Sequence, residues 1–390
     1  MLTLTCLLSV VLLLLGFCWL AGDHPHDAIP PLPAREIVTV RGSHYQMGLE
    51  HGKAFRDEIL FNIDRMHIWG GVSGNETACH ALLQRQYDAV ADYAPDVFEE
   101  IEGIAAGAGV EPETIKLMTF RAWNHFPSLC TAVGMKDSSG KVYIGGNIDD
   151  PAECYVLMRH EPSDAYNYVD MRWAGAAWGC NGINEKGFGY TLAGLWDTEH
   201  FEDPLPAVHI PTGIVHRTLL SKCATVAEAI EVLSEARVRW NTVLGDAKGN
   251  LAMAQCMGSV MGIEYPDDPG NNGLVGSSNH AFRRELIDAM AKQGKTPGAQ
   301  PGSLDRRRVI EGLRADPNVG WTLNDLQNVL RNHDNYRPGE GYPSICNDTQ
   351  AYSNCMEITA DEPEFYQAMA PACRHPYVGY KVKSRASLVE

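Results

Sequence analysis

Apolar residues recur at two different spacings along the chain, and the change comes near residue 130. Before it, apolar positions mostly recur at helical spacing after one short strand over 37–40. This spacing predicts a helix that Ser43 caps and that runs to about Arg65, followed by helices over 80–93, 95–106 and 111–123. After residue 130 the apolar runs shorten, and glycine and asparagine separate them. They predict strands over 130–135, 142–149, 155–160, 166–173, 178–183 and 187–193.

The rest of the chain returns to a mixed pattern. It predicts helices over 211–221 and 225–238, strands over 240–246 and 250–256, a loop over 264–273, helices over 303–315 and 322–332, and a tail with a few strands. Strands come in runs that helices bracket, and there is no βαβ alternation. The fold class is therefore predicted to be α+β, a layered sandwich without internal repeats.

The N-terminus has the pattern of a targeting segment. An almost wholly apolar run over residues 2–20 ends at Ala21 and Gly22, and a Pro-rich stretch over 23–36 follows. We interpret 1–22 as a signal peptide and 23–36 as a linker, which predicts a secreted, lumenal or periplasmic protein. No Lys or Arg precedes the apolar run, and the run is long enough to cross a bilayer. An uncleaved membrane anchor therefore remains the alternative.

The cysteines agree with export. Of 11 cysteines, Cys6 and Cys18 lie in the leader, and setting Cys130 aside leaves an even number in the rest of the chain. Such a set in an exported protein predicts disulfide bonds. The chain has no CxxC pair, which argues against structural zinc. Sequons at Asn75 and Asn347 predict a glycoprotein.

The net charge of the chain argues against some classes of binding partner. The formal net charge is −17, and no basic block occurs. This balance argues against binding to nucleic acid and to anionic membrane surfaces, and it indicates no stable membrane partner beyond the N-terminal segment.

A hairpin over 130–149 carries the candidate chemistry. Cys130 begins its first strand, and Asp149 ends its second. If the chain were cut between Leu129 and Cys130, the thiol would be a nucleophile and the new α-amine its base. The amine's ordinary pKa of about 7.7–8.0 suits a general base. The alternative for Cys130 is a buried or disulfide-bonded structural cysteine.

Several motifs, taken in order along the chain, match those of a known family. They are Arg41–Gly48 with His51-Gly52, Glu102–Val110, Cys130-Thr131 with Gly146–Asp149, and Gly182–Phe188, with weaker matches at Ser278–His280, Ser303–Arg308 and Leu330–Asp334. With these motifs the chain resembles the isopenicillin N acyltransferase (acyl-CoA:6-aminopenicillanic acid acyltransferase) family of N-terminal-nucleophile (Ntn) hydrolases. Its relatives include β-alanyl-dopamine hydrolase and the choloylglycine and penicillin V hydrolases. The resemblance runs from about residue 37 to the tail and implies a four-layer αββα fold. It implies self-cleavage before Cys130, with 37–129 and 130–390 sharing one domain.

The resemblance also implies roles for single residues. Cys130 matches the nucleophile, and Asp149 matches an aspartate that orients its α-amine. Asn184 and Asn279 match positions near the oxyanion, although asparagine is also common in turns. Arg306 or Arg307 matches a later arginine, against the alternative that the Arg306–Arg308 run is solvated. No metal or organic cofactor is implied.

Two positions depart from the family pattern, and several histidines need an interpretation. Leu129 stands where relatives often have glycine, and Asp150 stands where they commonly have an aromatic residue. The histidines have no metal-ligand spacing, so we interpret them as packing or loop residues. They are His51, His160, His209, His216, His280 and His333.

The predicted function is a self-processing Ntn amidohydrolase that cleaves the amide bond of a small N-acylated molecule through a thioester at Cys130. Two chains of one precursor would stay together. An acyltransferase that passes the acyl group to an amine is the first alternative. A papain-like protease is another, but the chain lacks the sequence motif around the cysteine of that family. An inactive, disulfide-stapled extracellular binding module is the alternative from another class of protein.

Overall fold

The computed structural model describes residues 34–70, 76–121, 129–195, 201–203, 210–299, 301–315, 320–335 and 344–384. The predicted signal peptide, most of the linker, the sequon at Asn75 and His209 lie outside these ranges. Among the residues so described, no helix has both the length and the apolar character needed to span a membrane.

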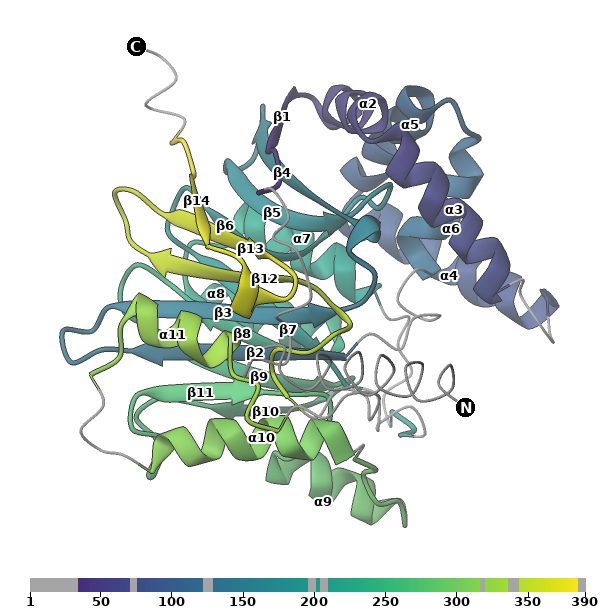
Figure 1. Cartoon of the computed structure of the whole chain (residues 1–390). Helices are drawn as coiled ribbons and strands as arrows, with labels where there is room; N and C mark the ends of the chain where they lie inside the picture. Colours follow the sequence, from purple (N-terminus) through teal and green to yellow (C-terminus); the bar gives the residue numbers. More distant parts are fainter. Residues whose placement is uncertain are drawn as a thin grey trace, which may run out of the picture.

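The strands form two sheets (Figure 1). All neighbouring strands run antiparallel except β1 and β4, which are parallel. The first sheet has the order β1 (Val38–Gly42), β4 (Tyr155–Pro162), β5 (Tyr168–Trp173), β6 (Gly179–Asn184), β7 (Gly189–Gly194), β8 (Arg239–Gly245), β9 (Leu251–Met257) and β10 (Val260–Glu264). The second has the order β11 (Leu274–Ser277), β2 (Leu129–Lys136), β3 (Val142–Asp149), β12 (Gln350–Ile358), β13 (Glu364–Met369) and β14 (Val378–Lys381).

The two sheets pack face to face, with β2 and β3 against β7 and β8. Helices α7 (Thr212–Lys222) and α8 (Val226–Ala236) pack against the first sheet, and α10 (Pro301–Arg314) and α11 (Leu323–Leu330) pack against the second. The fold is therefore the four-layer αββα sandwich, and the predicted fold class is confirmed. Helix α9 (Arg284–Lys292) lies beside β10.

A separate group of helices lies at the β1–β4 end of the first sheet (Figure 1). Its members are α2 (His44–Ala54), α3 (Arg56–Gly70), α4 (Glu76–Tyr93), α5 (Asp96–Ala108) and α6 (Pro112–Arg121). Ser43 caps α2 as predicted, in a capping box with Gln46. The single helix predicted from Ser43 to about Arg65 is wrong, because the backbone leaves helical conformation at Phe55, whose buried ring packs edge-on against His51.

Glycines let α2 and α5 touch along their backbones. A Cβ atom on Gly48 would overlap the carbonyl oxygen of Glu100, and one on Gly103 would overlap that of Tyr45. The sequence places Tyr45, Met47, Gly48 and Gly52 on one side of this helix and so predicts close packing there. The structure confirms it at Gly48 and Gly52, whereas the Tyr45 side chain is exposed.

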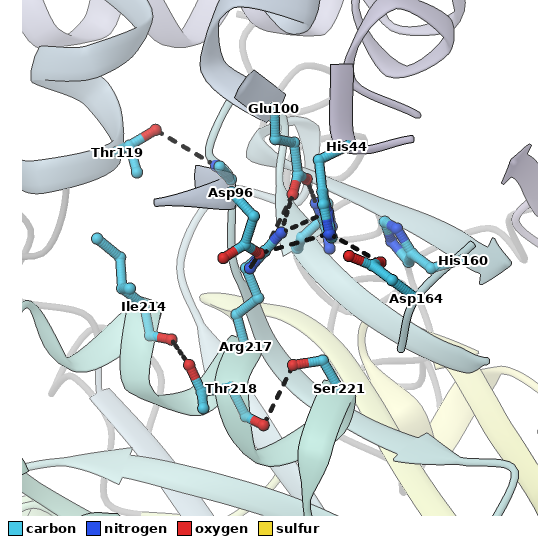
Figure 2. Close-up of polar contacts among 12 residues, drawn as sticks. His44, Asp96, Glu100, Thr119, His160, Asp164, Ile214, Arg217, Thr218 and Ser221 are labelled. Carbon is cyan, nitrogen blue, oxygen red and sulfur yellow. Dashed lines mark hydrogen bonds and ion pairs between the residues drawn. The ribbon is translucent and has the colours of Figure 1, made fainter. Parts of the chain in front are cut away.

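A buried ionic network joins this helical group to the first sheet and to α7. Arg172 of β5 donates from Nη1 to Glu100 Oε1 at 2.9 Å and from Nη2 to Asp170 at 2.8 Å. Figure 2 shows Arg217 of α7 pointing between Asp96, Glu100 and His44; its Nε donates to Glu100 Oε2 at 3.0 Å. These arginines hold the pKa of Glu100 well below its ordinary value despite the opposing effect of burial.

We expect Glu100→Gln to lower the free energy of unfolding by about 3–5 kcal/mol, because it removes one charge from a buried network and leaves two guanidinium groups short of a carboxylate. Urea unfolding of the purified protein measures this loss. Glu99→Gln, on the exposed face of the same helix, is the matched control and should change the free energy by less than about 0.5 kcal/mol. Equal effects of the two substitutions would contradict the role of the network.

Candidate functional site

Cys130 points into the layer between the two sheets. Side chains alternate along β2, so that Cys130 and Ala132 join the core between the sheets while Val133 and Met135 join the core under α10 and α11. The Cys130 side chain is fully buried. Its backbone N–H and C=O point sideways, toward the side of β2 on which β11 lies, and there they contact Asn279 and Arg306.

The main-chain nitrogen of Cys130 binds a side chain instead of a neighbouring strand. β11 ends opposite Ala132, and beyond that point the Cys130 N–H donates to Asn279 Oδ1 at 2.9 Å. Arg306 Nη2 donates to the same oxygen at 2.8 Å, and Arg306 Nη1 donates to the carbonyl oxygen of Cys130 and to Thr131 Oγ1. Because both neighbours of Oδ1 are donors, this orientation of the Asn279 amide is fixed.

The amide of Asn279 is held on every side. Its Nδ2 donates to the carbonyl oxygen of Gly194 at 3.0 Å, and its backbone N–H donates to Ser303 Oγ at 2.8 Å. Ser303 also contacts His280 Nδ1 at 2.8 Å. The sequence placed Asn279 near the oxyanion as an N–H donor. The structure instead turns its oxygen toward Cys130, so we assign it to positioning the Cys130 nitrogen.

Arg306 is fully buried, and the prediction that it reaches the site agrees with these contacts. Its neighbour Arg307 lies on another part of the helix surface and pairs with Glu264 and Glu311. The alternative of a solvated run is therefore wrong for Arg306 and Arg307, and only Arg308 of the three is exposed.

The thiol of Cys130 is strongly biased toward its protonated form in the uncut chain. Burial, together with the nearby carboxylate of Asp149, raises its pKa to about 12, against the lowering effects of the backbone N–H of Gly194 and the charge of Arg306. The thiol therefore needs a base to become a nucleophile at neutral pH.

Asp149 lies beside Cys130 in a buried position at the end of β3. Burial raises its pKa to about 7, against the lowering effects of Arg306 and of the Asn347 side chain. A carboxyl group with this pKa can exchange a proton near neutral pH. Sequence reasoning did not find Asn347 as a site residue; it was interpreted only as a sequon. Asn347 is buried, so the folded structure leaves no room for a glycan there, and this part of the glycoprotein prediction is wrong.

A second carboxylate, that of Asp150, follows Asp149 directly in the sequence. Asp150 accepts from the Tyr155 hydroxyl at 3.0 Å and pairs with Arg65 at 3.4 Å. Burial raises its pKa to about 6. The polar position that the sequence noted after Asp149 is therefore occupied by an ion pair rather than by an exposed charge.

Asn184 does not reach the nucleophile. Both protons of its Nδ2 are used by the carbonyl oxygens of Leu220 and Cys223, at 2.9 and 2.7 Å, and its Oδ1 accepts from the backbone of the β6–β7 turn. We therefore do not assign it to the oxyanion. Asn181, on the same strand, lies closer to the site, because its Nδ2 donates to the Tyr352 hydroxyl at 3.0 Å and Tyr352 lies within electrostatic range of Cys130.

The remaining histidines have structural contacts. His51 accepts from the backbone N–H of Gly175 at 3.1 Å, His216 contacts Thr242 at 3.0 Å, and His160 contacts Asp170 at 3.1 Å. His333 contacts the carbonyl oxygen of Arg331 at 2.9 Å. Within the described ranges, no group of three or more His, Cys, Asp or Glu residues is arranged to hold a metal ion.

The sequence of the region from 137 to 297 matches the family model of acyl-coenzyme A:6-aminopenicillanic acid acyl-transferase. This match agrees with the family resemblance that the sequence motifs indicated for this region. The matched residues include Asp149 and Asn279 and exclude Cys130 and Arg306, which the structure brings to the same place.

Three solved structures show a similar arrangement of the chain. An orthologue of N-acylethanolamine-hydrolyzing acid amidase from Caenorhabditis elegans is 14% identical with a TM-score of 0.41, over 59% of this chain and 93% of its own. A mutant of the conjugated bile acid hydrolase from Clostridium perfringens is 12% identical with a TM-score of 0.40, over 65% and 97%. Penicillin V acylase from Agrobacterium tumefaciens is 14% identical with a TM-score of 0.38, over 62% and 83%. No curated protein sequence matches the chain.

Proposed function

We propose that the chain is a self-processing Ntn amidohydrolase that cleaves the amide bond of small N-acylated molecules, with Cys130 as nucleophile. One observation carries the proposal. The nitrogen of the Leu129–Cys130 peptide, which cleavage would convert to an α-amine, already lies in a buried polar site made by Asn279 and Arg306 beside Asp149.

Each residue then has a role in the mature enzyme. The α-amine of Cys130 takes the thiol proton, and the sulfur attacks the acyl carbon of the substrate. Asn279 Oδ1 orients the amine, and Asp149 stabilises its ammonium form. Arg306 holds Asn279 and the main chain of Cys130 in place. The leaving amine takes the proton, and water resolves the thioester to give the acid and the free thiol.

The two segments on either side of Cys130 are proposed to stay together as one domain after cleavage. The ionic network supports this, because Glu100 and Asp96 precede the cut while Arg172 and Arg217 follow it. Residues from both segments also share the same hydrophobic core. Export through the N-terminal segment remains part of the proposal.

A screen of N-acyl amines and N-acyl amino acids, followed by quantification of the released amine, tests the proposal. We expect at least one compound to be hydrolysed by the wild type and none by Cys130→Ala. If an added amine acceptor takes the acyl group faster than water does, the chain is the acyltransferase of the first alternative. Hydrolysis that persists in Cys130→Ala would overturn the proposal.

A further inference from the structure

Two cysteines far apart in the sequence meet next to the site. Cys346 lies in the segment before β12, and Cys373 lies in the short 3-10 helix Ala372–Arg374. Cys346 is fully buried in a small cluster with Ala368 and Ala372, and the partly buried Cys373 packs against it. Their thiols are within hydrogen-bond distance of each other, and this contact raises the pKa of Cys346.

Other contacts hold the two segments at this separation. Gln350 Oε1 accepts from the backbone N–H of Ala372 at 2.9 Å and from the Cys346 thiol at 3.7 Å. The backbone N–H of Cys346 donates to the carbonyl oxygen of Asn332 at 2.8 Å. A covalent bond between the sulfurs would therefore join segments that already lie together, which a disulfide requires.

We propose that Cys346 and Cys373 form a disulfide bond when the protein meets an oxidising thiol pool. The structure describes eight cysteine side chains and holds all of them as thiols, so the general prediction of disulfides is not confirmed by it. The oxidant is a small disulfide such as oxidised glutathione. The half-buried thiolate of Cys373 attacks it and releases one reduced glutathione. Cys346 then attacks the mixed disulfide, loses its proton and releases the second.

The bond would fix a segment that contacts the site. Asn347 follows Cys346 directly, and its side chain acts on the pKa of Asp149. Asn147 Nδ2 donates to the carbonyl oxygen of Ile345 at 2.8 Å, and Gln350 pairs with Asp149 at the start of β12. Closing the loop from 346 to 373 therefore restrains Asn347, which acts on the Asp149 carboxyl group, and Gln350, which pairs with the Asp149 backbone.

Peptide mapping tests the proposal on the full-length protein. The wild type is equilibrated with oxidised glutathione, its thiols are alkylated, and it is digested without reductant. We expect one dominant cross-linked species that contains Cys346 and Cys373 and is two hydrogens lighter than the sum of its peptides. Alkylation of both residues, or links to other cysteines, would overturn the proposal, and this measurement needs no variant to fold.

Matched variants give a second measurement. Oxidised wild type should melt about 4 °C above the reduced form, as expected for a closed loop of this length in a chain of this size. Cys373→Ser should lose the cross-link and the shift. Cys355→Ser, which removes a buried thiol near Gln327, should keep both. Loss of the shift in Cys355→Ser alone, with the shift kept in Cys373→Ser, would contradict the pairing.

Discussion

Cys130→Ala is expected to give a single uncut and inactive chain, whereas the wild type is expected to give two chains, the second beginning at Cys130. In the uncut chain the Cys130 nitrogen is an amide that donates to Asn279, so it cannot act as a base. On the proposed mechanism, activity therefore requires cleavage. The Cys130 sulfur would attack the carbonyl carbon of Leu129, the acyl group would move from nitrogen to sulfur, and water would hydrolyse the thioester.

Asp149 lies opposite Leu129 in the hairpin and within electrostatic range of the Cys130 thiol. Its pKa of about 7 allows its carboxyl group to exchange a proton near neutral pH. Leu129 is buried and part of β2, paired with Asp149, so the bond to be cut lies inside the sheet. Cleavage there would leave the sheets in place, held by the ionic network and the shared core.

Denaturing electrophoresis with N-terminal sequencing of the purified proteins measures the outcome. Cys180→Ala is the matched control, because Cys180 is a second fully buried cysteine in the same core and should still permit cleavage. Cys130→Ser should cleave slowly, since a hydroxyl can perform the same shift. A wild type that is fully active as one uncut chain would exclude the Ntn mechanism and would return attention to the papain-like alternative.

The short apolar runs after residue 130 predicted the strands well. These strands are buried on both faces and so read as continuous apolar runs, and the Gly and Asn residues between the runs mark the turns. The pattern failed where tertiary contacts decide the local structure. The backbone leaves helical conformation at Phe55, β10 forms the edge of the first sheet beside β9, and α9 buries Leu286 and Met290 in a small separate core.

In the candidate site, too, sequence spacing predicted some residues, and the roles of others depend on tertiary contacts. A hairpin places Cys130 and Asp149 together, so their spacing was informative. Asn184 and Asn279 both lie at or near a strand end. Only the structure shows that Asn184 donates to carbonyl groups at the C-terminal end of α7, whereas Asn279 accepts from the Cys130 nitrogen. The burial of Arg306 depends on how α10 packs against β2 and β11, which no local pattern encodes.

Asp149→Asn is expected to abolish most turnover and, in the uncut chain, to stabilise the fold at neutral pH. The loss of turnover should be roughly 10²- to 10⁴-fold, the scale of a lost acid–base or amine-orienting group. Asparagine keeps the shape and removes the charge that holds the α-ammonium group. Steady-state kinetics on correctly cleaved protein measures this effect, and near-normal turnover there would remove Asp149 from the mechanism.

The effect on stability follows from the raised pKa. The pKa of the Asp149 carboxyl group rises from 3.8 in the unfolded chain to about 7 in the folded chain, so the folded state binds the proton more tightly than the unfolded state does. Below pH 3.8 the protonated Asp149 therefore does not lower the free energy of unfolding. As the pH rises toward about 7, Asp149 lowers the free energy of unfolding progressively. In the uncut Cys130→Ala background, Asp149→Asn should raise the free energy of unfolding by up to about 4 kcal/mol at pH 8, and the gain should vanish near pH 4.

Urea unfolding of the single and double variants across this pH range measures the gain. Asp57→Asn in the same background is the control, because the Asp57 side chain is 96% exposed and its charge lies in water in both states. It should leave the free energy of unfolding nearly unchanged at every pH. A gain for Asp149→Asn that is absent at pH 8, or that grows toward acid pH, would show that Asp149 is charged and stabilising in the folded chain, contrary to the burial that raises its pKa.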